Sequence, residues 1–180
     1  MYEAVLFLVD GFEEIEAIAT LDILRRGGVA AVSVSLMGRH EVTGSHEITI
    51  KADLILDELE DFTGAMLILP GGPGRVNFEK HELLLELLRM HNSDGGHIAA
   101  ICGAPTILGM LGLLSDKTAV CYPSVEGQLN AAKIGQCSTV TDGNITTSKA
   151  AATTLDFALE LLRIIKGDMK AAKVAEEILI

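Results

Sequence analysis

Short hydrophobic runs alternate with longer amphipathic segments along the chain. Residues 4–9 (AVLFLV) and 65–69 (AMLIL) are continuously apolar, which is typical of parallel strands buried on both faces. Residues 13–26 follow the first run with a helical period and end at Gly27-Gly28, a helix-terminating pair. The pattern predicts that this helix buries Ile15, Ile18, Ala19, Leu21 and Ile23.

The same alternation continues to the end of the chain. It predicts strands over 4–9, 30–37, 65–69, 97–101 and 118–121, with hairpins around 43–50 and 136–148. Helices are predicted over 13–26, 78–92, 106–114, 150–165 and 169–179. In the second helix we expect Leu83, Leu84, Leu87 and Leu88 to be buried and His81 and His91 to lie at the surface. Strands separated by such helices predict one α/β domain, residues 1–180, with a doubly wound parallel sheet and helices on both faces.

Composition and charge narrow the function classes. The chain has 180 residues, a net charge of −11 and no Trp, which argues against nucleic-acid binding. No apolar run approaches the roughly 18 residues that a membrane-spanning helix needs. Acidic residues follow the first apolar run, unlike a signal peptide. We therefore predict a cytoplasmic protein without nucleic-acid or membrane partners.

In a doubly wound sheet the functional site lies at the carboxyl ends of the strands. Three predicted loops, 10–16, 70–75 and 102–105, occupy that edge. Cys102 follows a strand of small residues and precedes Gly103, which resembles a nucleophile elbow without the full Gly-x-Ser-x-Gly string. Backbone N–H groups there are expected to lower the thiol pKa and to hold an oxyanion. The local pattern alone also fits plain burial of Cys102.

Three acids begin the first predicted helix. Glu13 and Glu14 are explained by the helix dipole, which favours acids in the first turn. Glu16 has apolar neighbours, so we interpret it as a buried carboxyl beside the thiol, with a raised pKa and a role as general acid–base. An ordinary solvated face is the alternative for Glu16.

Other candidate motifs are weaker. The loop 70–75 (PGGPGR) lacks the Gly-Lys-Ser/Thr end of a phosphate-binding loop, but its N–H groups can supply an oxyanion donor. No group of His, Cys or Asp has metal-ligand spacing, so no metal and no cofactor are predicted. Cys121 and Cys137 are interpreted as small buried residues. All five histidines precede Cys102, which disfavours the Cys–His pair of an amidase or peptidase.

Three motifs in order, residues 10–16 (DGFEEIE), 69–72 (LPGG) and 99–105 (AAICGAP), resemble the ThiJ/PfpI superfamily, in particular its parkinsonism-associated deglycase branch and bacterial relatives. The resemblance covers nearly the whole chain and implies a flavodoxin-like, class I glutamine-amidotransferase-like fold and a homodimer. It implies Cys102 as nucleophile and Glu16 as the acid that holds it. It also implies oxyanion and substrate binding by Gly71, Gly72 and Gly103.

The sequence departs from that family at two positions. Tyr122 stands where relatives often have a histidine before a proline, which puts a histidine relay in doubt. His46 stands where close relatives have an arginine lining an anion site, whereas Arg26 matches a second basic residue of that region. Gly103 after the cysteine differs from the Cys-His of protease-like branches.

The resemblance implies a cofactor-free enzyme that converts α-oxoaldehydes such as methylglyoxal to hydroxy acids, or that removes their adducts from glycated side chains. A redox-responsive stress protein or chaperone, sensing oxidation through Cys102, is the alternative from another class. An amidase or peptidase is a weaker one. The apolar chain end, Ile178, Leu179 and Ile180, also favours a homodimer, unless it packs on the domain.

Overall fold

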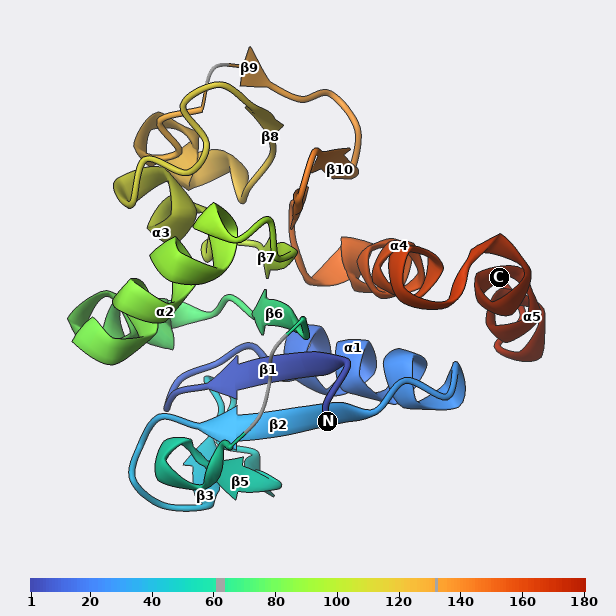
Figure 1. Cartoon of the computed structure of the whole chain (residues 1–180), viewed down its shortest axis with the longest axis horizontal. Coiled ribbons are helices and arrows are strands. Elements are labelled where there is room, and N and C mark those ends of the chain that lie inside the picture. The colour runs from blue at the N-terminus through green and yellow to red at the C-terminus, as the bar shows by residue number, and fades with distance from the viewer. Residues whose placement is uncertain (61–63, 132) are drawn as a thin grey trace.

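A seven-stranded sheet forms the centre of the protein in the computed structural model, which describes residues 1–60, 64–131 and 133–180 (Figure 1). Its strand order is β10-β11-β7-β6-β1-β2-β5, and every neighbouring pair is parallel except β10 with β11. The strands are β1 (Ala4–Leu8), β2 (Ala31–Ser35), β5 (Leu54–Ile55), β6 (Met66–Leu69), β7 (Ile98–Ile101), β10 (Thr139–Asp142) and β11 (Ile145–Ser148).

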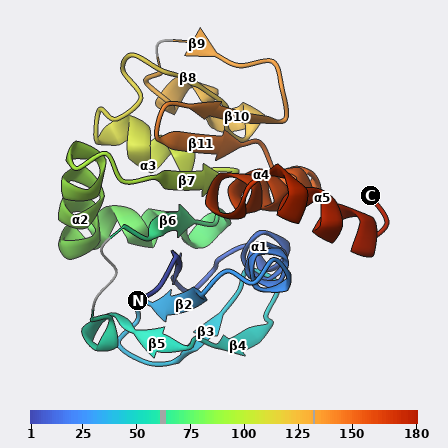
Figure 2. The same ribbon diagram turned by 45° about the vertical axis from the view of Figure 1, so that its right-hand side comes forward.

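Helices cover both faces of this sheet, as Figure 2 shows. One face carries α2 (Glu82–Ser93) and α3 (Pro105–Met110). The other carries α1 (Glu14–Arg26) and α4 (Thr154–Lys166), with α5 (Asp168–Glu177) packed on α4. The predicted doubly wound α/β fold is confirmed.

Alternating side chains of the strands build two separate hydrophobic cores. In β1, Val5 and Phe7 pack toward α2 and α3, whereas Leu6 and Leu8 pack toward α1 and α4. All four are at most 2% exposed. Burying each such side chain contributes roughly 1.5–3 kcal/mol before the entropic cost of folding. The continuous apolar runs therefore reflect strands that are covered on both faces.

The strand order reverses between β1 and β6, because the chain runs outward from β1 through β2 to β5 and then returns to β6. Segments that follow β1, β6 and β7 thus meet at the carboxyl edge of three adjacent strands. This is the switch point where doubly wound folds bind ligands. All three loops singled out from the sequence lie there.

Smaller elements frame this edge. A two-stranded hairpin, β3 (Glu41–Thr43) and β4 (Thr49–Lys51), confirms the turn predicted near residue 44, and Ser45 N–H donates to Phe12 O just before α1 (2.8 Å). Another pair comprises β8 (Thr118–Ala119) and β9 (Lys133–Ile134). The 3-10 segments span Leu56–Glu58 (η1), Pro73–Lys80 (η2), Pro123–Gln128 (η3) and Ala151–Thr153 (η4).

Several sequence predictions of burial are wrong. The inner face of α1 comprises Glu14, Glu16, Ala17, Thr20, Ile23 and Leu24. Ile15 and Ile18 are 57% and 42% exposed, because the helix is rotated relative to the predicted face.

The second predicted helix also differs in its start and in two burials. The α-helix begins at residue 82 rather than 78, since η2 occupies the preceding residues. Leu83 is 65% exposed, and His91 is buried with its ring against Gly96. Among the described residues, no helix has both the length and the hydropathy needed to cross a membrane.

Candidate active site

Cys102 occupies a sharp elbow between β7 and α3. Its φ is +63°, in the left-handed region that non-glycine residues seldom adopt. Three backbone hydrogen bonds hold the elbow: Cys102 N–H donates to Ser148 O (2.9 Å), Tyr122 N–H to Cys102 O (2.7 Å) and Ala104 N–H to Ile101 O (3.0 Å). Such a strained conformation persists only where its surroundings enforce it, as at many reactive centres.

Glu16 lies directly beside this elbow. It projects from the first turn of α1, is 1% exposed, and accepts a hydrogen bond from Gly71 N–H at Oε2 (2.8 Å). Its second oxygen, Oε1, is buried and has no hydrogen-bond partner among the described residues. The side chain of Cys102 lies close to this carboxyl, since a Cβ on Gly71 would meet both Cys102 Cβ and Glu16 Oε2. The structure thus brings together the two residues that the sequence singled out as catalytic.

The glycine turn after β6 closes the other side of the thiol. A Cβ on Gly71 would lie 2.7 Å from Cys102 Cβ and 2.8 Å from Glu16 Oε2, so only glycine fits between them. Gly72 adopts φ +99°, and a Cβ there would come within 2.5 Å of Glu13 N and Gly11 O. With these two glycines the turn packs closely against both the elbow and α1.

Burial governs the protonation of the pair. It raises the pKa of Glu16 to about 7, although the Gly71 N–H and the neighbouring thiol favour the carboxylate. Burial and the Glu16 charge together raise the pKa of Cys102 to about 12, against the hydrogen bonds from Gly103 and Gly72 N–H. The prediction of a raised Glu16 pKa is confirmed. The prediction of a lowered thiol pKa is wrong, because two N–H groups do not outweigh burial beside an acid.

A cleft of about 650 Å³ opens above Cys102. The residues predicted from the sequence that line it are Glu16, His46, Gly72, Cys102 and Gly103. Several other lining residues were not predicted individually as site residues, among them Glu13, Arg75, Ser124, Val125 and Ala150–Ala152. Tyr122 also lines the cleft and is 46% exposed. Within the described residues, no hydrogen bond joins a histidine to Cys102.

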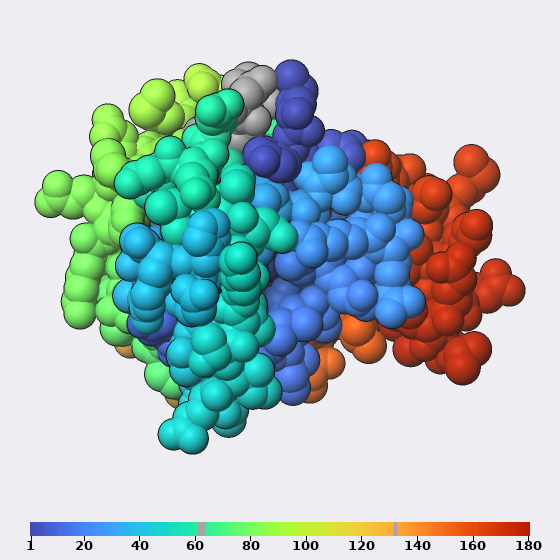
Figure 3. All heavy atoms as spheres, turned by 90° about the horizontal axis from the view of Figure 1, so that it is seen from below, coloured from blue at the N-terminus to red at the C-terminus, as the bar shows by residue number. Residues whose placement is uncertain are grey.

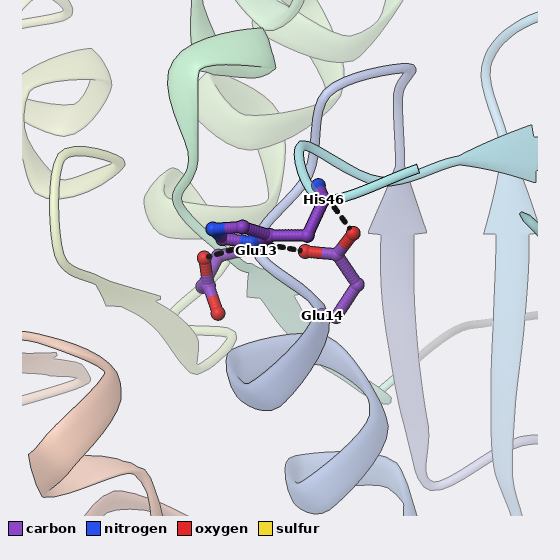
Figure 4. Close-up of side chains that lie close together, drawn as sticks. All are labelled: Glu13, Glu14 and His46. Atoms are coloured by element: carbon purple, nitrogen blue, oxygen red, sulfur yellow. Dashed lines mark hydrogen bonds and ion pairs between the residues drawn. The ribbon is translucent and has the colours of Figure 1, made fainter. Parts of the chain in front are cut away.

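An ion-pair cluster stands at the edge of this cleft, where the β3–β4 hairpin meets α1 (Figure 4). His46 donates from Nδ1 to Glu14 Oε2 (2.8 Å) and from its backbone N–H to Glu14 Oε1 (2.7 Å). Glu13 Oε2 lies 3.6 Å from the same ring nitrogen. Glu14 is 5% exposed, so the helix dipole, by which the sequence explained it, does not account for its pairing with His46.

The cluster has the composition of a metal site, which the sequence spacing did not indicate. Potential ligand atoms of Glu13, Glu14 and His46 lie within 4.8 Å of one another. However, Nδ1 of His46 already donates to Glu14, and a metal would have to displace that proton. The ion pair raises the pKa of His46 and, despite burial, lowers the pKa of Glu14 to about 2. The mutual pairing of these charges accounts for the arrangement.

Arg26 lies away from the cleft, contrary to its prediction as a substrate-binding residue. It is at the C-terminal end of α1, about 15 Å along the helix axis from Glu16 at 1.5 Å per residue. There it pairs with Asp22 (2.6 Å). Cys137 is exposed rather than buried, whereas Cys121 is buried as predicted.

Comparison with known proteins agrees with this fold. Residues 2–164 match the model of the DJ-1/PfpI family. Protein dj-1beta of Drosophila melanogaster is 36% identical over 98% of this chain and 96% of its own length. The crystal structure of Drosophila DJ-1beta aligns over 100% of this chain and 99% of that chain, with a TM-score of 0.93 and 35% identity.

Two further relatives have names that state an activity. The glutathione-independent glyoxalase DJR-1.2 of Caenorhabditis elegans is 30% identical, over 88% of this chain and 85% of its own. Deglycase PH1704 of Pyrococcus horikoshii is 28% identical, over 90% and 99%. The fold and the cysteine elbow define a flavodoxin-like α/β protein of the ThiJ/PfpI type. The chain belongs to the DJ-1/PfpI family.

Proposed function

We propose that the protein is a cysteine-dependent, cofactor-free enzyme that converts reactive α-oxoaldehydes such as methylglyoxal to hydroxy acids such as lactate. The same chemistry on a glycated side chain would make it a deglycase. The observation that supports this most strongly is the contact between a strained, cleft-lining Cys102 and a buried Glu16 whose pKa is about 7. A general acid–base with a pKa near 7 transfers protons efficiently in both directions. The names of two relatives, a glyoxalase and a deglycase, support the same class.

The first step is addition of the thiol to the aldehyde carbon. Ionised Glu16 removes the thiol proton as sulfur attacks, because the thiol pKa of about 12 leaves little free thiolate. The carbonyl oxygen takes up the electron pair, and the N–H groups of Gly72 and Gly103 stabilise the negative charge. Protonation of that oxygen gives a hemithioacetal.

Glu16 then moves a proton between two carbons. As a carboxylate it removes the hydrogen from the former aldehyde carbon, which gives an enediolate. As the acid it returns that proton to the neighbouring carbon, while the hydroxyl proton of the former aldehyde carbon passes to the neighbouring oxygen, which leaves a 2-hydroxy thioester on Cys102. Water cleaves the thioester, releases the hydroxy acid and regenerates the thiol. The net reaction adds one water molecule to methylglyoxal.

Glutathione-free loss of methylglyoxal with quantification of lactate tests this proposal. We expect Cys102→Ser to abolish lactate formation and Glu16→Gln to lower it by roughly 10²–10⁴-fold, the usual contribution of a general acid–base. Cys137→Ser is the matched control, since Cys137 is an exposed thiol outside the cleft. Aldehyde loss without lactate, or equal loss in all variants, would mean simple trapping by nucleophilic side chains and would overturn the proposal.

A redox-responsive role is the second candidate. Cys102 is partly exposed, and the unpartnered Oε1 of Glu16 can donate a hydrogen bond, when protonated, to an oxygen of a sulfinate on that sulfur. A chaperone or binding activity that appears after peroxide treatment, and that Glu16→Gln weakens, would favour this role. Equal activity of oxidised and reduced protein would exclude it.

We further propose that the enzyme is a homodimer that uses α1. Ile15, Ile18 and Ile48 are 57%, 42% and 51% exposed on α1 and the adjoining hairpin, segments that lie side by side in Figure 3. At the chain end, Leu179 and Ile180 are 91% and 59% exposed, whereas Ile178 is half-buried and packs against the core. Sedimentation of Ile15→Lys/Ile18→Lys against Leu179→Lys/Ile180→Lys distinguishes the two surfaces. Dimers that persist in both would contradict the proposal.

A further inference from the structure

Arg75 is a cation on the wall of the cleft that the proposed chemistry does not use. It lies in η2, and its side chain is 16% exposed. A Cβ on Gly103 would come within 2.5 Å of Arg75 Cδ and 2.6 Å of Arg75 Nε. The side chain therefore lies directly against the residue that follows the nucleophile, and the glycine at 103 makes this approach possible.

Hydrogen bonds fix the orientation of the guanidinium. Its Nη1 donates to Thr106 Oγ1 (3.0 Å) and to Glu79 Oε1 (3.1 Å). Thr106, which is 4% exposed, donates its own hydroxyl hydrogen to Gly103 O (2.7 Å). Arg75 is thus connected through one side chain to the backbone of the Cys102 elbow. This connection holds the charge at a set position relative to the nucleophile.

One edge of the guanidinium remains available for a ligand. Within residues 1–60, 64–131 and 133–180, neither Nε nor Nη2 of Arg75 has a hydrogen-bond partner, and neither atom is fully buried. These two nitrogens present parallel N–H donors, the geometry that matches the two oxygens of a carboxylate. A planar donor pair held beside a reactive thiol has the form of a substrate-orienting group.

Other charged side chains around the cleft do not neutralise the guanidinium of Arg75. Glu79 binds only Nη1 of Arg75 and is itself partly exposed. Glu13 also lines the cleft, but the ring of His46, whose pKa is raised, lies 3.6 Å from its carboxylate. Glu16, the other acid of the lining, is 1% exposed and lies beside Cys102. Among the charged side chains that the structure describes in the lining, Arg75 thus presents a pair of unshared N–H donors to a negatively charged substrate.

We propose that Arg75 determines substrate specificity by binding a carboxylate with its Nε–Nη2 edge, so that the preferred substrates are α-oxoaldehydes that carry a carboxylate. This inference rests on the proposed function for the dicarbonyl chemistry. It adds the substrate class, because the dicarbonyl end would meet Cys102 while the carboxylate meets Arg75. Neutral methylglyoxal would then be turned over without this contact.

A matched pair of compounds tests the inference: 4,5-dioxopentanoate, which carries a carboxylate, and its neutral methyl ester. In the native protein we expect kcat/KM to favour the acid by roughly 10–100-fold, the range expected for a charge-assisted hydrogen bond. Arg75→Gln should remove this preference through a higher KM for the acid, and Arg75→Lys should keep part of it. Arg89→Gln makes the same charge change on the exposed face of α2, outside the cleft, and should keep all of it.

Protection of Cys102 from alkylation by iodoacetamide gives a readout that needs no turnover. The acid should protect at a lower concentration than the ester in the native protein, and Arg75→Gln should abolish the difference. Protection of this kind without turnover would overturn the proposed enzyme function and leave the role of Arg75 standing. An acid-to-ester ratio near one in the native protein, or one that Arg75→Gln leaves unchanged in both assays, would overturn the inference.

Discussion

Glu14 and Glu16 stand two residues apart on the first turn of α1, and their carboxyls behave in opposite ways. Both are nearly fully buried, at 5% and 1% exposed. Burial raises the pKa of Glu16 to about 7. Burial acts in the same direction on Glu14, yet the pKa of Glu14 falls to about 2 because the ring and the backbone N–H of His46 both donate to it.

The comparison shows that the partners of a buried acid, rather than its burial, decide its chemistry. Glu14 accepts from the His46 ring and from a backbone N–H, so it remains a carboxylate and connects the hairpin to the helix. Glu16 has a single backbone donor, Gly71 N–H, and a neutral thiol. It therefore exchanges its proton near neutral pH. Glu14 therefore joins two elements of the structure, whereas Glu16 is the acid that we propose for catalysis.

Separating Glu16 from Cys102 should have the largest effect on activity. In Gly71→Ala the new methyl group would lie 2.7 Å from Cys102 Cβ and 2.8 Å from Glu16 Oε2, and must push the pair apart. We expect kcat/KM for methylglyoxal to fall by about 10²-fold, the usual cost of misplacing reacting groups by about 1 Å. Gly127→Ala is the control, because its new methyl group would have no neighbouring atom within 4 Å and its φ is not positive. Similar losses in both variants would count against a precise Glu16–Cys102 contact.

The pH dependence of activity should follow the ionisation of Glu16 alone. Glu16 acts as a base only when ionised, so kcat/KM should fall about tenfold per pH unit below a pKa of about 7 and level off above it. His46 also titrates at the edge of the cleft, with a pKa that its ion pair with Glu14 raises, so His46→Gln is the necessary control and should keep the inflection. Any residual activity of Glu16→Gln should lose the inflection. An inflection that follows His46 instead would assign the base to the ion-pair cluster.

Neutralising Glu14 should change stability more than activity. At pH 6 we expect Glu14→Gln to lower the free energy of unfolding by about 1–2 kcal/mol, the worth of hydrogen bonds to a charged group. Because the folded-state pKa of Glu14 is lowered, its stabilisation is full above pH 4.5 and is lost as the pH falls toward 2. The pKa of His46 is raised in the folded state, so the stabilisation that protonated His46 contributes is lost as the pH rises through this pKa.

Urea unfolding of Glu14→Gln and the native protein between pH 3 and 8 would measure this effect. Glu13→Gln is the matched control, since Glu13 lies 3.6 Å from the His46 ring and should change stability by less than about 0.5 kcal/mol. A difference between Glu14→Gln and native protein that persists unchanged at pH 3 would refute the ionic explanation.

The fold, and the proximity of Cys102 and Glu16, could be predicted from the sequence, whereas their proposed roles came from the family resemblance. Continuous apolar runs identified β1 and β6, and small residues around Cys102 indicated the elbow. These signals suffice because a strand covered on both faces and a tight turn each restrict residue type locally. The order of the loops then placed Glu16 and Cys102 at the same edge of the sheet.

Features that depend on distant partners could not be predicted in this way. The burial of Glu14 requires His46, which is 32 residues away on a hairpin whose packing no local pattern encodes. Arg75 becomes part of the cleft only because Gly103 lies under its side chain. The exposed face of α1 was misassigned because Ile15 and Ile18 have the same period as a buried face.

The left-handed backbone at Cys102 lowers the stability of the domain. Glycine adopts that conformation freely, whereas a residue with a side chain does so at a cost of roughly 1–2 kcal/mol. Selection for stability alone would favour glycine at position 102, which has no thiol. Cys102 therefore lowers the stability of the fold, and the proposed function requires its thiol. Stabilising substitutions should be made elsewhere in the chain.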